Sequence, residues 1–214
     1  MTAARSRKGA LTRARLLDAA KQIFEESGFL DARISDIAER ASVSHGSFYH
    51  YFDSKEQIFR EVTELVQEQL SSPMTEVILA PGSGAPPAQR LREALRRHLE
   101  TYRENARMMR VIEQVARFDE HVDALLRARH MEQRDLIAES IRQLQRRGMA
   151  DPRLNPTVAA AALGSMTSRF AEIWLAQGQL DCDIEDGAEQ LTCLFVNALG
   201  IRERGRQMTA PADQ

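Results

Sequence analysis

The sequence predicts an all-α protein: an N-terminal three-helix helix-turn-helix domain followed by a second, all-helical domain, with about nine helices in total. Three observations predict this fold class. Apolar residues recur at three- and four-residue intervals along most of the 214 residues. No segment shows the strict alternation of apolar and polar residues that is typical of strands. Near the N-terminus, two short apolar segments are separated by a break of three residues, Ser42 to Ser44.

The first predicted helix carries an apolar stripe and has recognisable ends. Thr12 is placed to act as its N-cap, and Gly28 is expected to end it in the way glycine commonly ends helices. The stripe between them consists of Leu16, Ala20, Ile23 and Phe24.

The next two predicted helices are short. The second spans about two turns, and Ser44 is expected to cap the third, which should end near Phe52. Helices of this length are unstable alone, so packing must hold them together. The apolar residues available for that packing are Ile34, Ile37, Ala38, Ala41, Val43, Phe48 and Phe52.

The third helix combines a buried stripe with unusual polar residues. Phe48 and Phe52, four residues apart, should face the core. Gly46 has an intrinsic helix cost of roughly 1 kcal/mol relative to alanine, and its lack of a side chain would let a partner approach the backbone. In a helix-turn-helix the second helix of the pair enters the major groove of DNA. The residues predicted to lie on other faces of this helix are His45, Ser47, Tyr49 and His50.

The segment from Gly28 to Phe59, GFLDARISDIAERASVSHGSFYHYFDSKEQIF, resembles the DNA-binding motif of the TetR family of bacterial transcriptional regulators. Motif positions that match are Gly28, Phe29, Ile37, Ala38, Ala41, Val43, Ser44, Gly46, Tyr49, Phe52, Lys55 and Glu56. The resemblance covers roughly the first 60 residues. The rest of the chain is similar to the family only in its length and helical pattern.

The resemblance implies a role for specific residues. Arg33 and Ser35, at the start of the second helix, would contact phosphates, and Lys55 would contact the DNA backbone from the start of the fourth helix. Hydroxyls, lysine and helix N-termini are good phosphate partners, whereas base reading requires donors or acceptors at groove depth. The implied DNA contacts of the third helix are Ser44, His45, Gly46, Ser47, Tyr49 and His50.

Three positions depart from the family pattern. Arg33 replaces a Ser or Thr that commonly caps the second helix, so a cap is lost and a cation is gained. Ser42 stands where the turn often has glycine, and it is expected at a positive φ. His45 stands where lysine is common. With an unperturbed pKa near 6.5 it is either a plain neutral donor or a contact that strengthens in mild acid.

Charge is distributed unevenly. The net charge is −2, which alone argues against a nucleic-acid binder. However, the segment ending at Leu17 carries +5, and the remaining residues therefore carry −7. A basic head on an acidic body indicates a local anionic partner, although a solvated basic tail is the alternative. The basic residues of this arm are Arg5, Arg7, Lys8, Arg13 and Arg15.

The second domain is expected to begin with a long connector helix. It runs from Lys55 past Leu65 to Gln69, and Pro73 together with residues 80–89 (APGSGAPPAQ) is expected to break it into a flexible loop. Later apolar stripes predict further helices, one of them long and ending at Gly148. The predicted organisation is a DNA-binding domain over residues 1–54, a ligand-binding and dimerisation domain over 55–205, and a disordered tail over 206–214.

The last two predicted helices, which begin near Val158 and Ile184, are rich in small residues. Two such helices from each of two chains form a four-helix interface, and TetR-like proteins dimerise through their last two long helices. Packing within one chain is the alternative. A homodimer with two DNA-binding heads implies a near-palindromic operator.

A small-molecule effector of unknown identity, lipophilic or acidic, is the other expected partner. Methionine conforms to irregular cavities, although such stripes also occur as ordinary core. Arg107, Arg110 and Arg169 would suit an acidic ligand, unless they are simply solvated. The predicted ligand-binding residues are Tyr102, Met108, Met109, Ile112, Met131, Met166, Phe170 and Trp174.

Other functional classes find no support in the sequence. His98, His121 and His130 lie on separate predicted segments, no catalytic or phosphate-binding motif appears, and neither an enzyme, a metal nor a cofactor is expected. No stretch is long enough to span a membrane, so a cytoplasmic location is expected. Cys182 and Cys193 are ordinary thiols or, alternatively, redox sensors.

The predicted function is therefore a ligand-responsive, homodimeric DNA-binding repressor. An activator, a regulator without a ligand, and a helical interaction protein that has lost DNA binding are the alternatives.

Overall fold

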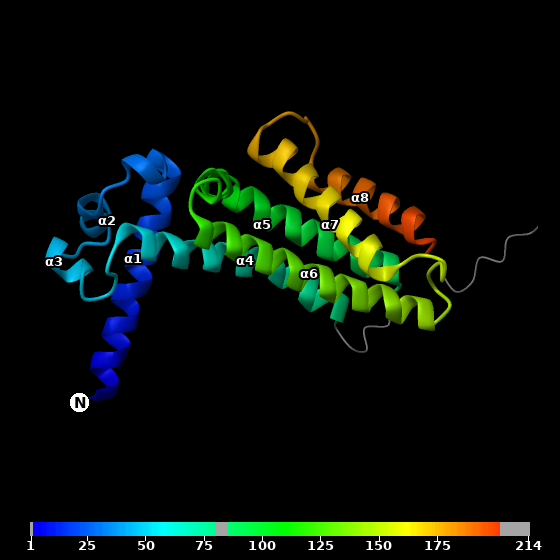
Figure 1. Ribbon diagram of the computed structural model, residues 1–214, viewed down its shortest axis with the longest axis horizontal. Helices are drawn as coiled ribbons and strands as arrows, with labels where there is room; N and C mark the ends of the chain where they lie inside the picture. Colours follow the sequence, from blue (N-terminus) through cyan, green and yellow to red (C-terminus); the bar gives the residue numbers. More distant parts are fainter. Residues whose placement is uncertain (1, 80–84, 202–214) are drawn as a thin grey trace, which may run out of the picture. The chain divides into compact units, whose positions relative to one another are not determined.

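The computed structural model describes the backbone of residues 2–79 and 85–201, and the side chains of residues 7–71 and 85–201. Within these residues the chain is helical and contains no strand, as predicted (Figure 1). Eight α-helices and one π-helical segment, η1, which continues α7, follow each other along the described part of the chain. Their bounds are α1 Thr2–Asp31, α2 Ile34–Arg40, α3 His45–Phe48, α4 Lys55–Leu79, α5 Pro87–Ala116, α6 Glu120–Arg146, α7 Pro156–Ala171, η1 Glu172–Ala176 and α8 Ile184–Leu199.

Helix α1 begins earlier than predicted. It starts at Thr2, and the Thr12 hydroxyl donates a hydrogen bond of 3.0 Å to the carbonyl of Lys8, so Thr12 lies inside the helix and is not its N-cap. The helical conformation is interrupted at Gly28, which has φ 75° and ψ 175°. Glycine adopts this backbone without strain, and the predicted break at Gly28 is therefore confirmed.

Proline does not act as the predicted breaker in the middle of the chain. Helix α4 continues past Pro73 to Leu79, and α5 begins at Pro87, inside the segment predicted to be a loop. Proline lacks an N–H, which the first turn of a helix does not need, so it is well suited to position 87. Of the predicted loop, residues 80–84 lie outside the described residues, as does the predicted tail from residue 206.

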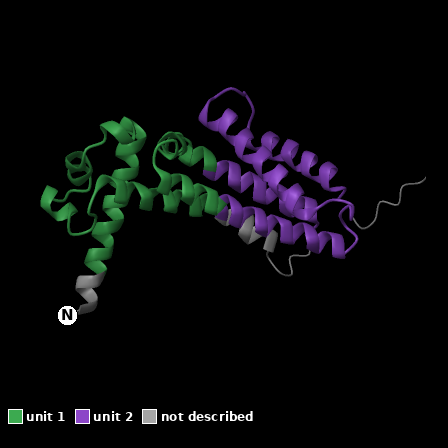
Figure 2. Ribbon diagram, in the orientation of Figure 1, with its two compact units in different colours: residues 1–70, 102–129 green, residues 71–101, 130–214 purple. Residues whose placement is uncertain are grey.

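The chain divides into two compact units (Figure 2). Unit 1 contains residues 1–70 and 102–129, and unit 2 contains residues 71–101 and 130–214. Helices α4, α5 and α6 therefore each contribute residues to both units. The DNA-binding domain that the sequence predicts, residues 1–54, lies within unit 1 together with the first turns of α4.

Aromatic rings form part of the core of unit 1. Phe24 packs edge-on against Phe59 with ring centroids 5.0 Å apart, and Phe29 contacts Phe59 at 4.8 Å. Phe48 and Phe52, both almost completely buried, lie 5.7 Å apart and fix the segment after α2. Edge-to-face ring pairs of this kind stabilise a core beyond their buried area.

Unit 2 has well-defined helix ends. Gly148, at φ 68°, follows α6 as predicted, and Gly200, at φ 59°, follows α8. The Asn155 side chain accepts hydrogen bonds from two backbone N–H groups at the start of α7, and Asp183 caps α8. Such caps satisfy backbone groups that the helix itself leaves unpaired.

One helix pair of unit 2 packs unusually closely. Trp174, in η1, is only 5% exposed, and a Cβ atom placed on Gly187 of α8 would lie 2.5 Å from the indole ring. Only glycine therefore leaves room for the indole at this position. None of the described helices is both long enough and apolar enough to cross a bilayer.

Candidate nucleic-acid interface

Helices α2 and α3 form the predicted helix-turn-helix. The turn between them contains Ser42 at φ 54°, the only non-glycine residue with a positive φ among those described. The amide of Val43 donates to the carbonyl of Ala38 at 2.9 Å and closes the turn. The expectation that Ser42 adopts a left-handed conformation is confirmed, and this conformation costs a non-glycine residue roughly 1 to 2 kcal/mol.

Helix α3 is shorter than predicted. It ends at Phe48, and residues 49–51 continue as turns held by hydrogen bonds such as that from the Tyr51 amide to the Phe48 carbonyl, 2.9 Å. Ser44 is the predicted N-cap: its hydroxyl oxygen accepts from the amide of Ser47 at 3.1 Å. The hydroxyls of Ser44 and Ser47 are also 2.7 Å apart, so both predicted contact residues are held in place within the chain.

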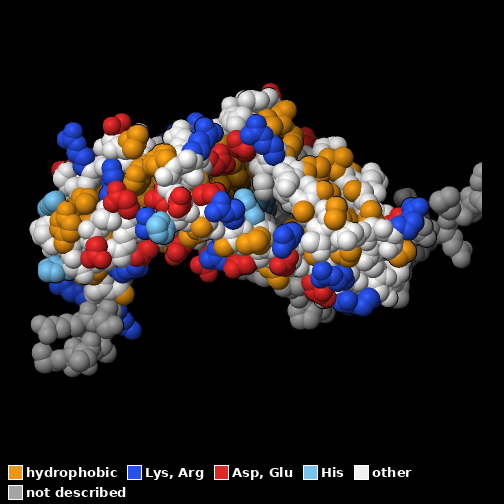
Figure 3. Space-filling model, in the orientation of Figure 1, with side chains coloured by type: hydrophobic (Ala, Val, Ile, Leu, Met, Phe, Trp, Pro, Cys, Tyr) orange, Lys and Arg blue, Asp and Glu red, His pale blue; other side chains and the backbone are white. Residues whose placement is uncertain are grey.

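The surface of α3 is exposed and polar. Tyr49 is 50% exposed, its ring lies 5.4 Å from that of His45, and His50 is exposed beside it. Gly46 is also exposed, and a Cβ atom added to it would meet nothing within 4 Å. Figure 3 shows histidine side chains over α3 at the end of unit 1, with Lys and Arg side chains gathered over the nearby part of α1. No packing within the described chain explains a glycine at position 46.

The start of α2 is exposed as well. Arg33 is the N-cap residue in position but makes no side-chain cap hydrogen bond, which confirms that a cap is lost there. The Ser35 hydroxyl donates to a carboxylate oxygen of Asp36 at 3.0 Å. The side chains of Arg33 and Ser35 are exposed to solvent. An unfilled helix N-terminus with a cation beside it is suited to an anionic group.

Lys55 has internal partners that the sequence did not predict. Its ammonium group donates to the carbonyls of Phe29, Leu30 and Ala32 at 2.8, 3.0 and 2.9 Å and lies 4.8 Å from the centre of the Phe29 ring. It thus binds the carbonyls that follow the interruption at Gly28. The signal in the sequence was the break at Gly28, which leaves carbonyls in need of donors.

Two other cations of unit 1 are also engaged. Arg13 pairs with Glu61 of α4 and stacks 5.0 Å from the centre of the Phe52 ring, so it is not free in the basic arm. Arg40 makes two hydrogen bonds to Glu26 of α1, and these keep the pKa of the Glu26 carboxyl below its ordinary value. Arg7, Lys8 and Arg15 remain exposed, whereas the side chain of Arg5 lies outside the described residues.

The predicted ligand-binding residues are divided between the two units. Those in unit 1 are buried, and the amide of Gln67 donates to the Met109 sulfur at 3.4 Å. In unit 2, Met131 is 51% exposed. Trp174 packs against Gly187, and the centre of its ring lies 5.4 Å from that of Phe170. None of the eight lines the cavity that the start of α5, the end of α6 and the end of α8 form in unit 2. Four lie in unit 1, namely Tyr102, Met108, Met109 and Ile112, and four in unit 2, namely Met131, Met166, Phe170 and Trp174.

Two segments of the chain match known protein families. Residues 16–62 match the family described as bacterial regulatory proteins, tetR family, and residues 84–199 match the tetracyclin repressor-like C-terminal domain. The chain is 28% identical to the HTH-type transcriptional regulator UidR of Escherichia coli K12 over 158 residues, which cover 73% of this chain and 78% of UidR. It is 36% identical to the repressor KstR2 of Rhodococcus jostii over 66 residues, 31% of this chain and 32% of KstR2.

Solved structures show the same fold. One of them is NalD, the secondary repressor of the MexAB-OprM multidrug efflux pump in Pseudomonas aeruginosa. It superposes with a TM-score of 0.69 at 22% identity, and the superposed residues cover 90% of this chain and 98% of the NalD chain. Together, the exposed face of α3, the helix-turn-helix geometry and the two family matches lead to one conclusion. The chain belongs to the TetR family of DNA-binding transcriptional regulators, and it is not an enzyme.

Proposed function

We propose that this protein is a homodimeric repressor that binds a near-palindromic operator and is released by a small-molecule effector. The observation that carries the DNA-binding part is the surface of α3, where Gly46 faces open space beside the exposed rings of Tyr49 and His45. A bare backbone next to side-chain donors lets a helix approach base edges closely. The names of KstR2 and NalD, both repressors, favour repression over activation.

The proposed DNA contacts fall into two groups. At the start of α2, Arg33 and Ser35 would contact phosphates, and the exposed Arg7, Lys8 and Arg15 would follow the DNA backbone. Lys55 would reach a phosphate only by giving up hydrogen bonds to carbonyls, so its main contribution is to hold α4 against α1. Ser44 and Ser47 would keep the first turn of α3 rigid. The residues that would approach the base edges are His45 and Gly46 in α3 and Tyr49 and His50 directly after it.

Dimerisation would use an exposed face of α7 and α8. Val158 is 65% exposed and Leu194 is 52% exposed, and small residues such as Ala161, Ala162 and Ala198 are exposed on the same two helices. Small residues allow helices to approach closely, and contiguous exposed apolar patches mark sites of protein–protein interaction. Two heads about 34 to 36 Å apart would meet successive major grooves on one face of DNA.

Release by an effector requires differential affinity. A ligand weakens operator binding only if its affinity is higher for the conformation that cannot bind DNA than for the conformation that can. The proposed regulator acts in the cytoplasm, where its operator is accessible.

The DNA-binding part is tested by selecting genomic fragments with the purified protein, sequencing them and titrating salt on the best fragment. A near-palindrome with steep salt dependence is expected, because lysine and arginine contacts displace counterions. His50→Ala should weaken binding to this fragment by about tenfold. His121→Ala, the same change at an exposed residue of α6, is the matched control and should leave it unchanged.

Two results would contradict the proposal. If no fragment is preferred at any salt concentration, the protein is an interaction module that has lost DNA binding. If His50→Ala and His121→Ala bind equally well, α3 does not read the operator. Sedimentation equilibrium tests the dimer separately: Leu194→Arg should yield a monomer, whereas Met131→Arg, at an equally exposed position on α6, should not.

A further inference from the structure

Unit 2 contains a cavity of about 100 Å³ that sequence reasoning did not find. Its walls come from the first turns of α5, the last turns of α6 and the end of α8. The floor is apolar and buried: Ile141 and Phe195 are each 2% exposed, Leu199 is 4% exposed and Ile137 is 7% exposed. A cavity with such a floor favours an apolar body over water.

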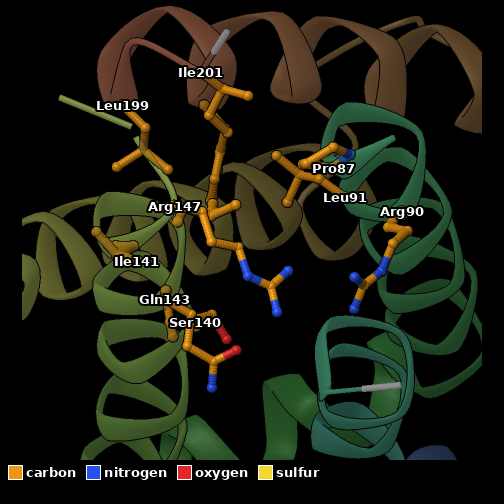
Figure 4. Close-up of a pocket in the computed structure, with 12 residues that line it drawn as sticks. Pro87, Arg90, Leu91, Ser140, Ile141, Gln143, Arg147, Leu199 and Ile201 are labelled. Carbon is orange, nitrogen blue, oxygen red and sulfur yellow. The ribbon is translucent and has the colours of Figure 1, made fainter. Parts of the chain in front are cut away.

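The mouth of this cavity has a different chemistry. Figure 4 shows the guanidinium groups of Arg90, from α5, and Arg147, from the end of α6, directed into the same space. Gln143 and Ser140 add polar groups on the α6 side. None of the twelve lining residues is an aspartate or a glutamate.

Arg147 is available for a ligand. Within the part of the chain that the structure describes, it makes no ion pair, whereas Arg142 and Arg146 on the same helix both pair with Glu139. It follows the last turn of α6, where the partial negative charge of the helix end favours a cation. A guanidinium presents several donors in a planar fork that matches a carboxylate or phosphate.

From these observations we propose that the cavity binds an amphiphilic anion, with its apolar body on the floor and its carboxylate or phosphate at Arg147 and Arg90. An engineered apolar cavity of about 150 Å³ holds benzene. The smaller cavity of unit 2, about 100 Å³, therefore suits an apolar body of about four to six carbons. A longer tail would have to extend out of the mouth. This inference names the effector class, and its regulatory consequence rests on the proposed function.

The binding step is tested without DNA. Isothermal titration calorimetry of the full chain with sodium hexanoate should show saturable binding. Acetate, which lacks the body, and hexanol, which lacks the charge, should each bind at least about tenfold more weakly. Absence of hexanoate binding overturns the proposal. Equal binding of hexanol overturns the anionic part of it. Hexyl phosphate, titrated in parallel, distinguishes a phosphate ligand from a carboxylate.

Matched variants locate the site. Arg147→Gln should weaken hexanoate binding by about tenfold or more, because a charge-assisted hydrogen bond is lost. Arg146→Gln removes the same charge one residue earlier, outside the cavity lining, and should leave binding unchanged. Leu91→Trp should fill the cavity and abolish binding while keeping both arginines. Thermal unfolding of each variant without ligand verifies that it is folded, and equal affinity of Arg147→Gln and Arg146→Gln overturns the assignment.

The regulatory consequence is measured last, on the selected operator fragment. Hexanoate should lower operator affinity for the wild type and for Arg146→Gln but not for Arg147→Gln. If hexanoate binds but operator affinity does not change, the regulatory part is overturned and the binding site stands. If no operator is found, the proposed function fails while the calorimetric test is unaffected.

Discussion

Two helical glycines, one in each compact unit, occur for opposite reasons. Gly46 of α3 faces open space, and an added Cβ atom would meet nothing within 4 Å. Gly187 of α8 faces the Trp174 ring, where an added Cβ atom would lie 2.5 Å from the nearest ring atom. Glycine is unfavourable in both helices. At Gly187 the chain itself supplies the compensation, whereas at Gly46 any compensation must come from a partner.

These two glycines differ in whether packing or recognition requires them. A glycine required by packing should resist substitution in a stability measurement. A glycine kept for a partner should tolerate substitution in stability and fail only in binding.

Gly187→Ala should lower the free energy of unfolding by about 1 to 3 kcal/mol, because the methyl group overpacks the space beside Trp174. Urea titration followed by circular dichroism measures it. In a Trp174→Leu background the same substitution should cost clearly less, since the ring atoms that it would meet are gone. An equal cost in both backgrounds would show that the indole is not the cause.

Lys55→Met should lower the free energy of unfolding by about 1.5 to 3 kcal/mol, because three carbonyls after Gly28 lose a charged donor. The same urea titration measures this change. Lys8→Met, at an exposed position of the arm, is the control and should stay within about 0.5 kcal/mol of wild type. Wild-type stability of Lys55→Met would show that this lysine serves DNA alone.

Gly46→Ala should raise the free energy of unfolding by up to about 1 kcal/mol, since alanine favours the helix and its Cβ atom meets no neighbour. On the selected operator fragment, the same variant should bind about tenfold more weakly. The pair of measurements is decisive because the two changes have opposite signs. A variant that gains stability and keeps full affinity would remove the argument for close approach at this glycine.

The smallest effect concerns acid stability. Hydrogen bonds from Arg96, which has the larger effect, and from Arg97 lower the pKa of the Glu93 carboxyl from 4.5 to about 2. The resulting stabilisation is present above pH 4.5 and is lost as the pH falls toward 2. Because the Glu93 side chain is 37% exposed, solvent screening limits this contribution to a few tenths of a kcal/mol.

Glu93→Gln should therefore lower stability slightly at pH 7 and flatten its dependence on pH between 5 and 3. Urea titrations at several pH values measure the effect, with Glu104→Gln, at an exposed position of the same helix, as the control. A pH dependence as steep as that of wild type would contradict the role of the Arg96 and Arg97 hydrogen bonds.

Local chemistry made much of unit 1 predictable. The Ser44 cap, the buried pair Phe48 and Phe52, and the positive φ of Ser42 all follow from short-range geometry that a sequence displays directly. The same reasoning failed at Thr12, whose hydroxyl bonds a carbonyl four residues earlier inside α1, and at Pro73, through which α4 continues.

The sequence by itself determined the helical class, the helix-turn-helix and the identity of its polar residues, because periodicity, caps and turns act over a few neighbouring positions. Only the tertiary structure decided which cations remain free. Arg13 and Lys55 bind partners 48 and 23 to 26 residues away, as the Arg13–Glu61 pair and the carbonyls near Gly28 show. The cavity at Arg147 joins three helices whose apolar stripes look alike in sequence, and packing alone distinguishes a cavity wall from a filled core.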